Sequence, residues 1–207
     1  MSNPSTIEKQ IKHAVAILKK GGIVAFPTDT VYGLGADPLN AQAVAAIYKV
    51  KRRPSNLPLP LLLAEKSDLL KVASVVPDIA WQLVERFLPG ALTLVLKKGP
   101  RVPASVTASG DTVAVRIPNH PIPVALIRGL GAPIIGTSAN ISGQPSPVTA
   151  EEVRGQLDED VDLIIDGGRC PGGVESTVLD VTGKVPAIIR EGAVSREEIA
   201  KVCGALL

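Results

Sequence analysis

The chain has 207 residues, enough for one domain with a sizeable hydrophobic core and short for two. Apolar residues make up 45% of the sequence and aromatic residues only 2%, so the core must consist mainly of Val, Ile, Leu and Ala. That composition favours strands alternating with helices, the α/β class. A net charge of +2 excludes a nucleic-acid clamp that uses the charge of the whole surface. Any phosphate site must be a local basic cluster.

Several other classes are excluded by missing patterns. Cys170 and Cys203 have neither a metal-binding spacing nor a disulfide framework, which indicates a reducing compartment and predicts a cytoplasmic protein. No apolar run reaches the length of a membrane span, and we find no signal-peptide pattern. The sequence has no plausible Ser-His-Asp set and no metal-ligand cluster. The P-loop and dinucleotide fingerprints are absent too, so any ATP must be bound without them.

Helix and strand patterns alternate along the chain, with no compositional boundary and no internal repeat to divide it. Helices are predicted up to about residue 20, at 41–49, from residue 67 or 68, from an N-cap at Asp78, after His120, from Thr149 to about 157, and from Ser195. Strands are predicted at residues 23–26, 59–63, 92–96, 112–117, 133–135, 163–165, 177–181 and 187–190. We therefore predict one α/β domain over residues 1–207, with its core at about 6–204.

The stretch from Pro27 to Gly35 is predicted to be the loop that leaves the first buried strand, because Pro27 lacks an N–H. It holds three hydroxyls and a carboxylate, and Gly33 and Gly35 permit unusual backbone angles and the close approach of a ligand. Ligands of α/β proteins tend to bind outside the carboxyl ends of strands. From this stretch alone, a ligand-binding loop and an ordinary turn are equally good interpretations.

Two features concentrate positive charge. Lys49, Lys51, Arg52 and Arg53 lie within five residues, and Lys51 and Arg53 would point the same way in an extended segment. A lysine beside a forked arginine suits a polyphosphate, although such a cluster taken alone is more simply a solvated basic face or a nucleic-acid patch. Arg116 ends an apolar strand, so it must pair with a buried carboxylate or hold an anionic ligand. We favour the ligand.

Later segments repeat the pattern of small polar residues after a strand. The run from Gly136 to Gly143 carries Ser138 and Asn140, which could face one ligand or form an Asx-type turn. Near the C-terminus, a glycine-rich loop leads through Ser176 into a predicted strand, and Arg190 ends the next strand.

Set in order, these segments resemble the YrdC/Sua5 family, the threonylcarbamoyl-adenylate synthases. Six motifs carry the resemblance: PTDTVYGLG at 27–35, KRRP at 51–54, VRIP at 115–118, TSANISG at 137–143, VESTV at 174–178 and REG at 190–192. Each motif is weak alone, but six in one order are a strong signal. The resemblance runs from about Thr6 to the last predicted helix.

The resemblance implies a single YrdC-like domain, with a twisted mixed β-sheet flanked by helices and a concave, positively charged cavity. It implies a nucleotidyltransferase that makes threonylcarbamoyl-AMP and pyrophosphate from L-threonine, bicarbonate and ATP. Mg²⁺ is expected on the phosphates, held largely by the nucleotide and water. The product would serve the t6A modification of adenosine 37 in tRNAs that read ANN codons. The partners implied are a tRNA-modifying complex that receives the intermediate, with at most weak RNA binding and no membrane.

By motif position, the resemblance implies a set of site residues. L-threonine would be held by Thr30, Arg116, Ser138 and Ser176. The nucleotide would be held by Lys51, Arg53, Thr112, Asn140 and Arg190, with Lys51 and Arg53 as the catalytic residues and no protein ligand for a metal. Arg116 would take the amino-acid carboxylate, while Lys51 and Arg53 would offset charge at the α-phosphoryl group. Thr28 and Asp29 receive no ligand role and are expected to serve the loop's own hydrogen bonds.

The sequence departs from the family's pattern in two respects. Leu57 and Leu62 stand where longer relatives carry Asn and His, which changes the expected contacts to both substrates. The chain stops at Leu207, so we expect the C-terminal domain of the long form to be absent.

Two alternative functions stay open. A YciO-like relative has no established synthase role, and that branch tends to lose the Ser138-Ala139-Asn140 and Lys51/Arg53 features that this sequence keeps. An RNA-binding module could use the basic cavity, although the small net charge and the lack of stacking aromatics oppose it.

Overall fold

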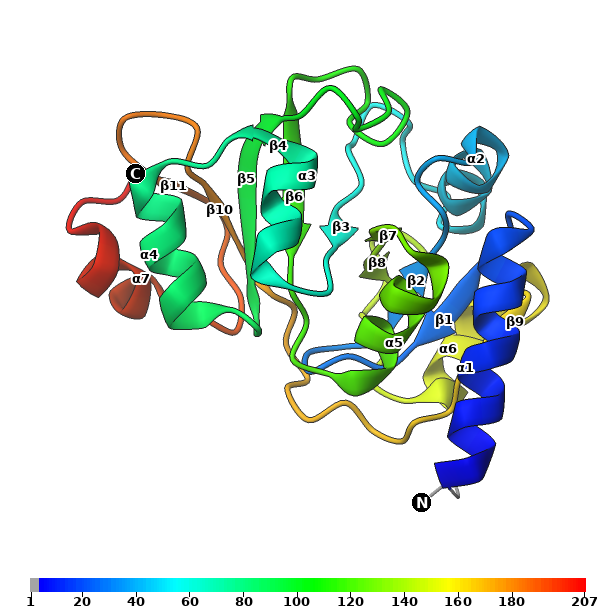
Figure 1. Ribbon diagram of the computed structural model, residues 1–207. Helices are drawn as coiled ribbons and strands as arrows, with labels where there is room; N and C mark the ends of the chain where they lie inside the picture. The colour runs from blue at the N-terminus through cyan, green and yellow to red at the C-terminus, as the bar shows by residue number, and fades with distance from the viewer. Residues whose placement is uncertain (1–3) are drawn as a thin grey trace.

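The computed structural model describes residues 4–207, and the side chains from residue 6 onward. Two β-sheets stand side by side with helices packed on their outer faces, which gives the molecule two lobes (Figure 1). Both sheets contain parallel and antiparallel pairs. The prediction of a mixed α/β fold is therefore confirmed, but the single sheet that we expected is divided into two.

The larger sheet forms the lobe on the left of Figure 1. Its strand order is β11 (Ala187–Arg190), β10 (Thr177–Asp180), β5 (Leu92–Lys98), β6 (Thr112–Arg116), β3 (Leu61–Leu62) and β7 (Ile134–Ile135), with β4 (Ala73–Val75) paired to β5. Strand β5 alternates between the two faces: Leu92, Leu94 and Leu96 are fully buried. Helices α4 (Asp78–Phe87) and α7 (Arg196–Cys203) pack together beside this sheet. Thr93 and Val95 therefore face the opposite side, toward the smaller lobe.

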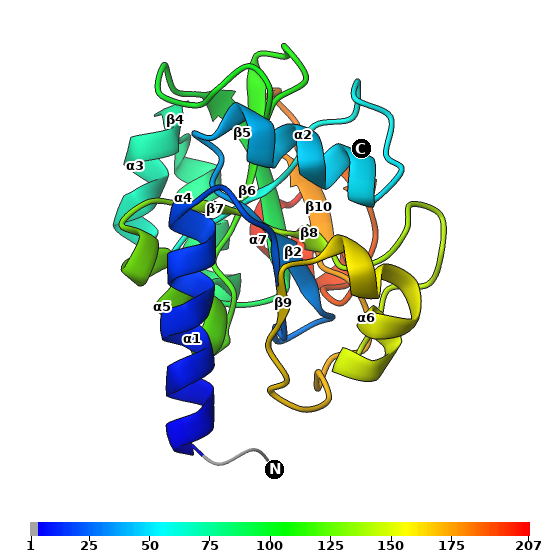
Figure 2. The same cartoon turned by 90° about the vertical axis from the view of Figure 1, so that its right-hand side faces the viewer.

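The smaller sheet has the order β8 (Thr137–Ser138), β2 (Gly33–Gly35), β1 (Val24–Phe26) and β9 (Leu163–Ile164). Helices α1 (Pro4–Lys19), α5 (Pro121–Leu130) and α6 (Ala150–Leu157) lie around it, and Figure 2 shows the length of α1 from the side. Helix α2 (Ala41–Val50) follows the β1–β2 hairpin, and the short α3 (Leu69–Val72) precedes β4. Two 3₁₀ turns complete the chain, at Lys66–Asp68 and Asp158–Asp160. None of the described helices is long and apolar enough to cross a membrane.

The chain passes from the larger to the smaller sheet at Gly136, between β7 and β8, and returns to the larger sheet between β9 and β10. A Cβ atom at Gly136 would lie 2.2 Å from the side chain of Leu62, so only glycine fits this crossing. Leu62 is itself paired with Arg116 across β3 and β6. The crossing therefore brings strand ends of both sheets to the same place.

The eight predicted strands all form, and three short ones were missed: β2, β4 and β8. In β2 the two glycines do not adopt left-handed angles. A Cβ atom at Gly33 or Gly35 would instead lie 2.9 or 2.6 Å from the ring of Phe26. Our reading of these glycines as loop residues that admit a ligand was wrong, because it is the Phe26 ring that approaches them.

Three of the predicted N-cap residues are confirmed. Asn40 caps α2, Thr149 caps α6, and Ser195 and Glu198 form a reciprocal capping box at α7. Asp78 was predicted to cap α4, but the N-cap residue is Pro77 and Asp78 is the first residue of the helix. A carboxylate in the first turn still stabilises the positive end of the helix dipole.

Candidate functional site

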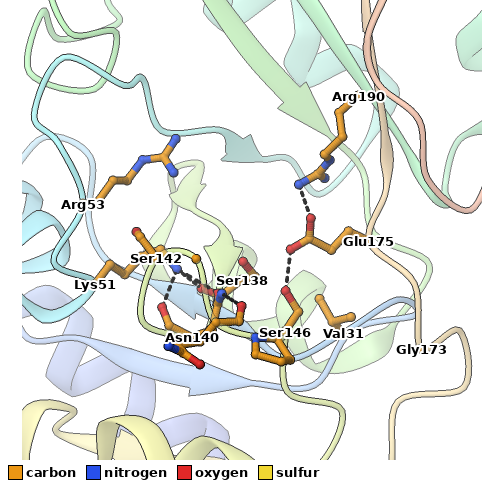
Figure 3. Close-up of a pocket in the computed structure, with 13 residues that line it drawn as sticks. Val31, Lys51, Arg53, Ser138, Asn140, Ser142, Ser146, Gly173, Glu175 and Arg190 are labelled. Carbon is orange, nitrogen blue, oxygen red and sulfur yellow. Dashed lines mark hydrogen bonds and ion pairs between the residues drawn. The ribbon is translucent and has the colours of Figure 1, made fainter.

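Two adjoining cavities open between the lobes, with volumes of about 570 Å³ and 360 Å³. We call them the first and the second cavity. They share five lining residues: Val31, Arg53, Ser138, Glu175 and Arg190. Figure 3 looks into the first cavity, where Arg53 and Arg190 stand on opposite sides and the loop that carries Ser138 and Asn140 lies below them. The shared residues therefore form the junction between the two cavities.

The floor of the second cavity is the open face of the larger sheet. Small and β-branched side chains from adjacent strands line it, among them Thr93, Val95, Ala114 and Val178. All four residues that the motifs assigned to L-threonine line this same cavity: Thr30, Arg116, Ser138 and Ser176. The Ser176 hydroxyl lies 2.8 Å from that of Thr93, and both are buried.

The first cavity gathers the residues that the motifs assigned to the nucleotide, with one exception. Lys51, Arg53, Asn140 and Arg190 all line it. Thr112 lines neither cavity, because it begins β6 opposite Lys97 while Arg116 ends that strand. Thr112 and Arg116 are four positions apart in an extended strand, which corresponds to about 13 Å. The structure does not bring Thr112 to the site.

Arg116 is anchored on three sides. Its Nη2 atom lies 2.7 Å from Oδ1 of Asp29, its Nη1 donates to the Thr30 hydroxyl at 2.8 Å, and its Nε donates to the Gly90 carbonyl at 2.9 Å. We had favoured a ligand over a buried carboxylate as the partner of Arg116, and the carboxylate is what the structure shows. These contacts use three of the five N–H groups of a guanidinium, which leaves two without a partner among the described residues.

The loop residues before Thr30 thus have two different roles. Thr28 bonds within its own loop, as expected, to the Thr30 hydroxyl and to the carbonyl of Val31 at 2.6 Å. Asp29 was expected to do the same, but it binds Arg116 and accepts from the backbone N–H of Asn119 at 3.1 Å. Sequence reasoning missed this pairing because the two residues are 87 positions apart.

Lys51 holds the loop that carries Ser138. It is the C-cap residue of α2, and the residue is only 2% exposed. The segment from Lys51 to Arg53 is not extended as predicted, because the backbone turns at Arg52, where φ is 49°. The Nζ atom donates to the carbonyls of Ser138 and Asn140 at 2.5 and 2.7 Å, and to Oδ1 of Asn140 at 3.1 Å. Burial lowers the pKa of Lys51 from 10.5 to about 8, and the charge of Arg53 acts in the same direction.

Arg53 reaches into both cavities from the basic loop. Its Nη2 atom donates to the carbonyl of Pro58 at 3.1 Å, and Leu57 lines the second cavity beside it. Burial lowers the pKa of this guanidinium, but an arginine stays charged at neutral pH. Leu57 and Leu62 thus present apolar side chains to the second cavity. At these two positions the family resemblance implies Asn and His in longer relatives.

Glu175 is a site residue that sequence reasoning missed. One carboxylate oxygen accepts from the Ser146 hydroxyl at 2.5 Å, and the other pairs with Nη1 of Arg190, as Figure 3 shows. Burial raises the pKa of Glu175, but hydrogen bonds from Ser146 and Ser138 and the charge of Arg190 outweigh burial, so its pKa lies below the usual value. The available signal was its place beside Ser176 in the VESTV motif.

The charges of the first cavity favour an anion. Lys51, Arg53 and Arg190 line it against one carboxylate, Glu175. Among the described residues no group of three His, Cys, Asp or Glu side chains is arranged to hold a metal ion. Hydrogen-bond donors and cationic side chains are therefore what the first cavity offers to a ligand.

Comparison with known proteins shows the family to which the chain belongs. The family model Sua5_yciO_yrdC, described as telomere recombination, matches residues 16–192. The threonylcarbamoyl-AMP synthase of Bacillus subtilis is 47% identical over 201 residues, which cover 97% of this chain and 58% of that protein.

Two solved structures have the same fold. That of Pyrococcus abyssi Sua5 complexed with L-threonine is 46% identical with a TM-score of 0.92, and covers 95% of this chain and 58% of that one. That of Escherichia coli YciO is 31% identical with a TM-score of 0.85, and covers 95% of this chain and 93% of the other. The chain thus spans little more than half the length of the first two relatives.

Proposed function

The chain belongs to the Sua5/YciO/YrdC family, and from that premise we propose that it is an L-threonylcarbamoyladenylate synthase. It would convert L-threonine, bicarbonate and ATP into threonylcarbamoyl-AMP and pyrophosphate, which makes it a nucleotidyltransferase. The observation that carries this proposal is the gathering of two residue sets at two adjoining cavities. The threonine set lines the second cavity and the nucleotide set, apart from Thr112, lines the first, with Ser138, Arg53 and Arg190 shared by both.

L-threonine would occupy the second cavity with its carboxylate on Arg116. The anchored guanidinium keeps two N–H groups for this purpose, and Asp29 and Thr30 fix its orientation before the substrate arrives. Ser138 and Ser176 offer hydroxyls to the substrate's polar groups. Such pre-orientation lowers the entropy that must be lost on the way to the transition state.

ATP would occupy the first cavity with its phosphates among Lys51, Arg53 and Arg190. The ammonium group of L-threonine first loses a proton to solvent, and the resulting amine combines with bicarbonate to give N-carboxythreonine and water. A carboxylate oxygen of that group then attacks the α-phosphorus, and pyrophosphate leaves. Arg53 lines both cavities, so it can offset the charge that develops at the phosphorus. Positioning and charge neutralisation carry this chemistry, with no need for a strong base.

Lys51 acts differently from Arg53 in this scheme. Its ammonium group already donates three hydrogen bonds to Ser138 and Asn140. It therefore contributes its charge to the phosphates while it holds the Ser138 loop against the first cavity. Its role combines catalysis with positioning.

Mg²⁺ fits the first cavity only as an ion carried by the nucleotide. The one carboxylate that lines it, Glu175, is engaged by Arg190 and Ser146. The phosphates and water would therefore supply most of the ligands, and the ion would neutralise phosphate charge.

The product would pass to a tRNA-modifying complex for the t6A modification of adenosine 37. We place this activity in the cytoplasm, where Cys170 and Cys203, which are both free thiols, stay reduced.

The proposal is tested by incubating the purified chain with ATP, Mg²⁺, bicarbonate and L-threonine and measuring pyrophosphate. We expect release that depends on L-threonine. Release no greater than in a reaction without L-threonine would contradict the proposal. It would favour the YciO-like alternative, which the similarity to E. coli YciO supports. RNA binding that weakens with salt, without ATP turnover, would favour the RNA-binding module.

A further inference from the structure

The junction between the two cavities contains one anionic side chain, that of Glu175. Of the five residues that line both cavities, Val31 has no polar side-chain group, and Arg53 and Arg190 are cationic donors. Ser138 is a neutral hydroxyl. Glu175 is therefore the charged acceptor that the described lining of both cavities presents at the junction.

The proposed reaction requires the substrate's amino group to lie at this junction. The threonine carboxylate is assigned to Arg116 in the second cavity, and the carboxylate group formed on the nitrogen must reach the α-phosphorus in the first. L-threonine arrives as an ammonium ion at neutral pH, and two arginines at the junction repel that charge. A cation is accommodated in a partly buried site only when a facing anion compensates for its desolvation.

We propose that Glu175 binds the ammonium group of L-threonine and so positions the nitrogen at the junction between the cavities. This inference rests on the proposed function and assigns to that site a residue that the motif comparison left without a role. Arg116 and Glu175 would then hold the two charged ends of the amino acid. That arrangement fixes which end of the substrate faces the nucleotide.

The contacts of Glu175 suit this role. Ser146 binds one carboxylate oxygen at 2.5 Å and Arg190 binds the other. Two carboxylate oxygens offer about four acceptor sites, so an ammonium group can bind beside the donors Ser146, Arg190 and Ser138. The same contacts keep the carboxylate ionised, since they hold the pKa of Glu175 below its usual value despite burial. The carboxylate is thus a fixed negative charge.

The competing explanation is structural: Glu175 would serve only as the partner of Arg190 and Ser146. The two explanations differ in what they predict for a ligand without an amino group. (R)-3-Hydroxybutanoate is L-threonine with the amino group replaced by hydrogen. If Glu175 binds the ammonium group, its loss lowers the affinity for L-threonine and leaves the affinity for this analogue unchanged. If its loss only disturbs the cavity, both affinities fall.

The test compares the wild-type chain with Glu175→Gln, using ligand-observed NMR titrations of each compound without ATP. We expect L-threonine to bind about ten- to a hundredfold more weakly to the variant. Binding of 3-hydroxybutanoate should change less than about threefold. Glu151→Gln makes the same chemical change at an exposed position of α6 and should leave both affinities unchanged.

Unchanged L-threonine affinity in Glu175→Gln, or an equal loss for both ligands, would overturn the inference and leave the proposed function standing. Wild-type chain that binds no L-threonine would overturn the proposed function and the inference together. Thermal melting of each variant checks the fold. Should Glu175→Gln not fold, Glu175→Asp withdraws the charge by one methylene and should show the same selective loss of L-threonine.

Discussion

Asp29 and Arg116 form a buried ion pair that joins the two lobes. The carboxylate belongs to the β1–β2 hairpin of the smaller sheet and the guanidinium to the end of β6 in the larger one, with 2.7 Å between Oδ1 and Nη2. The side chains are only 14% and 8% exposed. The pair therefore fixes the spacing between the sheets at the second cavity and orients the group that is proposed to take the substrate's carboxylate.

Asp29→Ala should destabilise the protein by about 3–5 kcal/mol, because it leaves the charge of Arg116 buried without its partner. Urea denaturation at pH 7 measures this change. Asp111→Ala is the matched control, since it breaks an ion pair with Lys97 whose side chains are 79% and 49% exposed. The control should show no measurable change. Equal midpoints for the two variants would refute a structural role for the Asp29–Arg116 pair.

Arg53→Ala should reduce kcat/KM for ATP about ten- to a hundredfold, which corresponds to roughly 1.5–3 kcal/mol for a lost charge-assisted contact. Steady-state pyrophosphate release measures it. Lys49→Ala removes the same charge from an exposed position of α2 and should retain wild-type kinetics. Similar losses in both variants would mean that only the overall charge matters.

The pH dependence of stability should report the burial of Lys51. Burial lowers the pKa of Lys51 from 10.5 to about 8, so between those values the unfolded chain binds a proton that the folded chain lacks. The contribution of Lys51 to the free energy of unfolding therefore increases as pH rises through that window, by up to about 1.4 kcal/mol per pH unit. Below pH 8 the full cost of burying the charge is present.

Urea denaturation of wild type and Lys51→Met at pH 7.5 and 9 isolates this effect. The stability of wild type relative to the variant should increase by about 1 kcal/mol between the two pH values. A difference that stays constant with pH would show that Lys51 titrates at its ordinary value.

Gly35→Ala should destabilise the protein by about 1–3 kcal/mol, the usual effect of overpacking, since its Cβ would lie 2.6 Å from the Phe26 ring and 3.1 Å from the Ile135 carbonyl. Gly155→Ala provides the contrast: it lies in α6 with nothing within 4 Å of its Cβ. That change should stabilise the protein by up to about 1 kcal/mol. Thermal melts of both variants test the pair, and a stabilised Gly35→Ala would show that the Phe26 ring does not restrict this position.

The strands could be predicted where apolar residues run together, as in β5 and β6. Strands β2 and β8 could not, because Gly33-Leu34-Gly35 and Thr137-Ser138 carry no alternating apolar pattern. Their pairing depends on partners that are distant in sequence, such as Gly33 with Ser138. The passage from the larger to the smaller sheet at Gly136 also has no local signature.

The motifs named residues that line the cavities, but they did not reveal contacts that depend on a partner distant in sequence. Thr30, Arg116, Ser138 and Ser176 were named from their motifs, and the structure gathers them at one cavity. The role of Asp29 depends on Arg116, which is 87 residues away. That of Glu175 depends on Ser146 and Arg190. The sequence of a loop does not indicate which cationic side chain will pair with its carboxylate.

The most direct test of the account supplies ¹³C-labelled bicarbonate together with ATP, Mg²⁺ and L-threonine, and analyses the nucleotide products by mass spectrometry. The account predicts an adenylate whose mass equals AMP plus a threonylcarbamoyl group carrying one ¹³C, formed only when L-threonine is present. An adenylate fraction that contains no label in the complete mixture would contradict it.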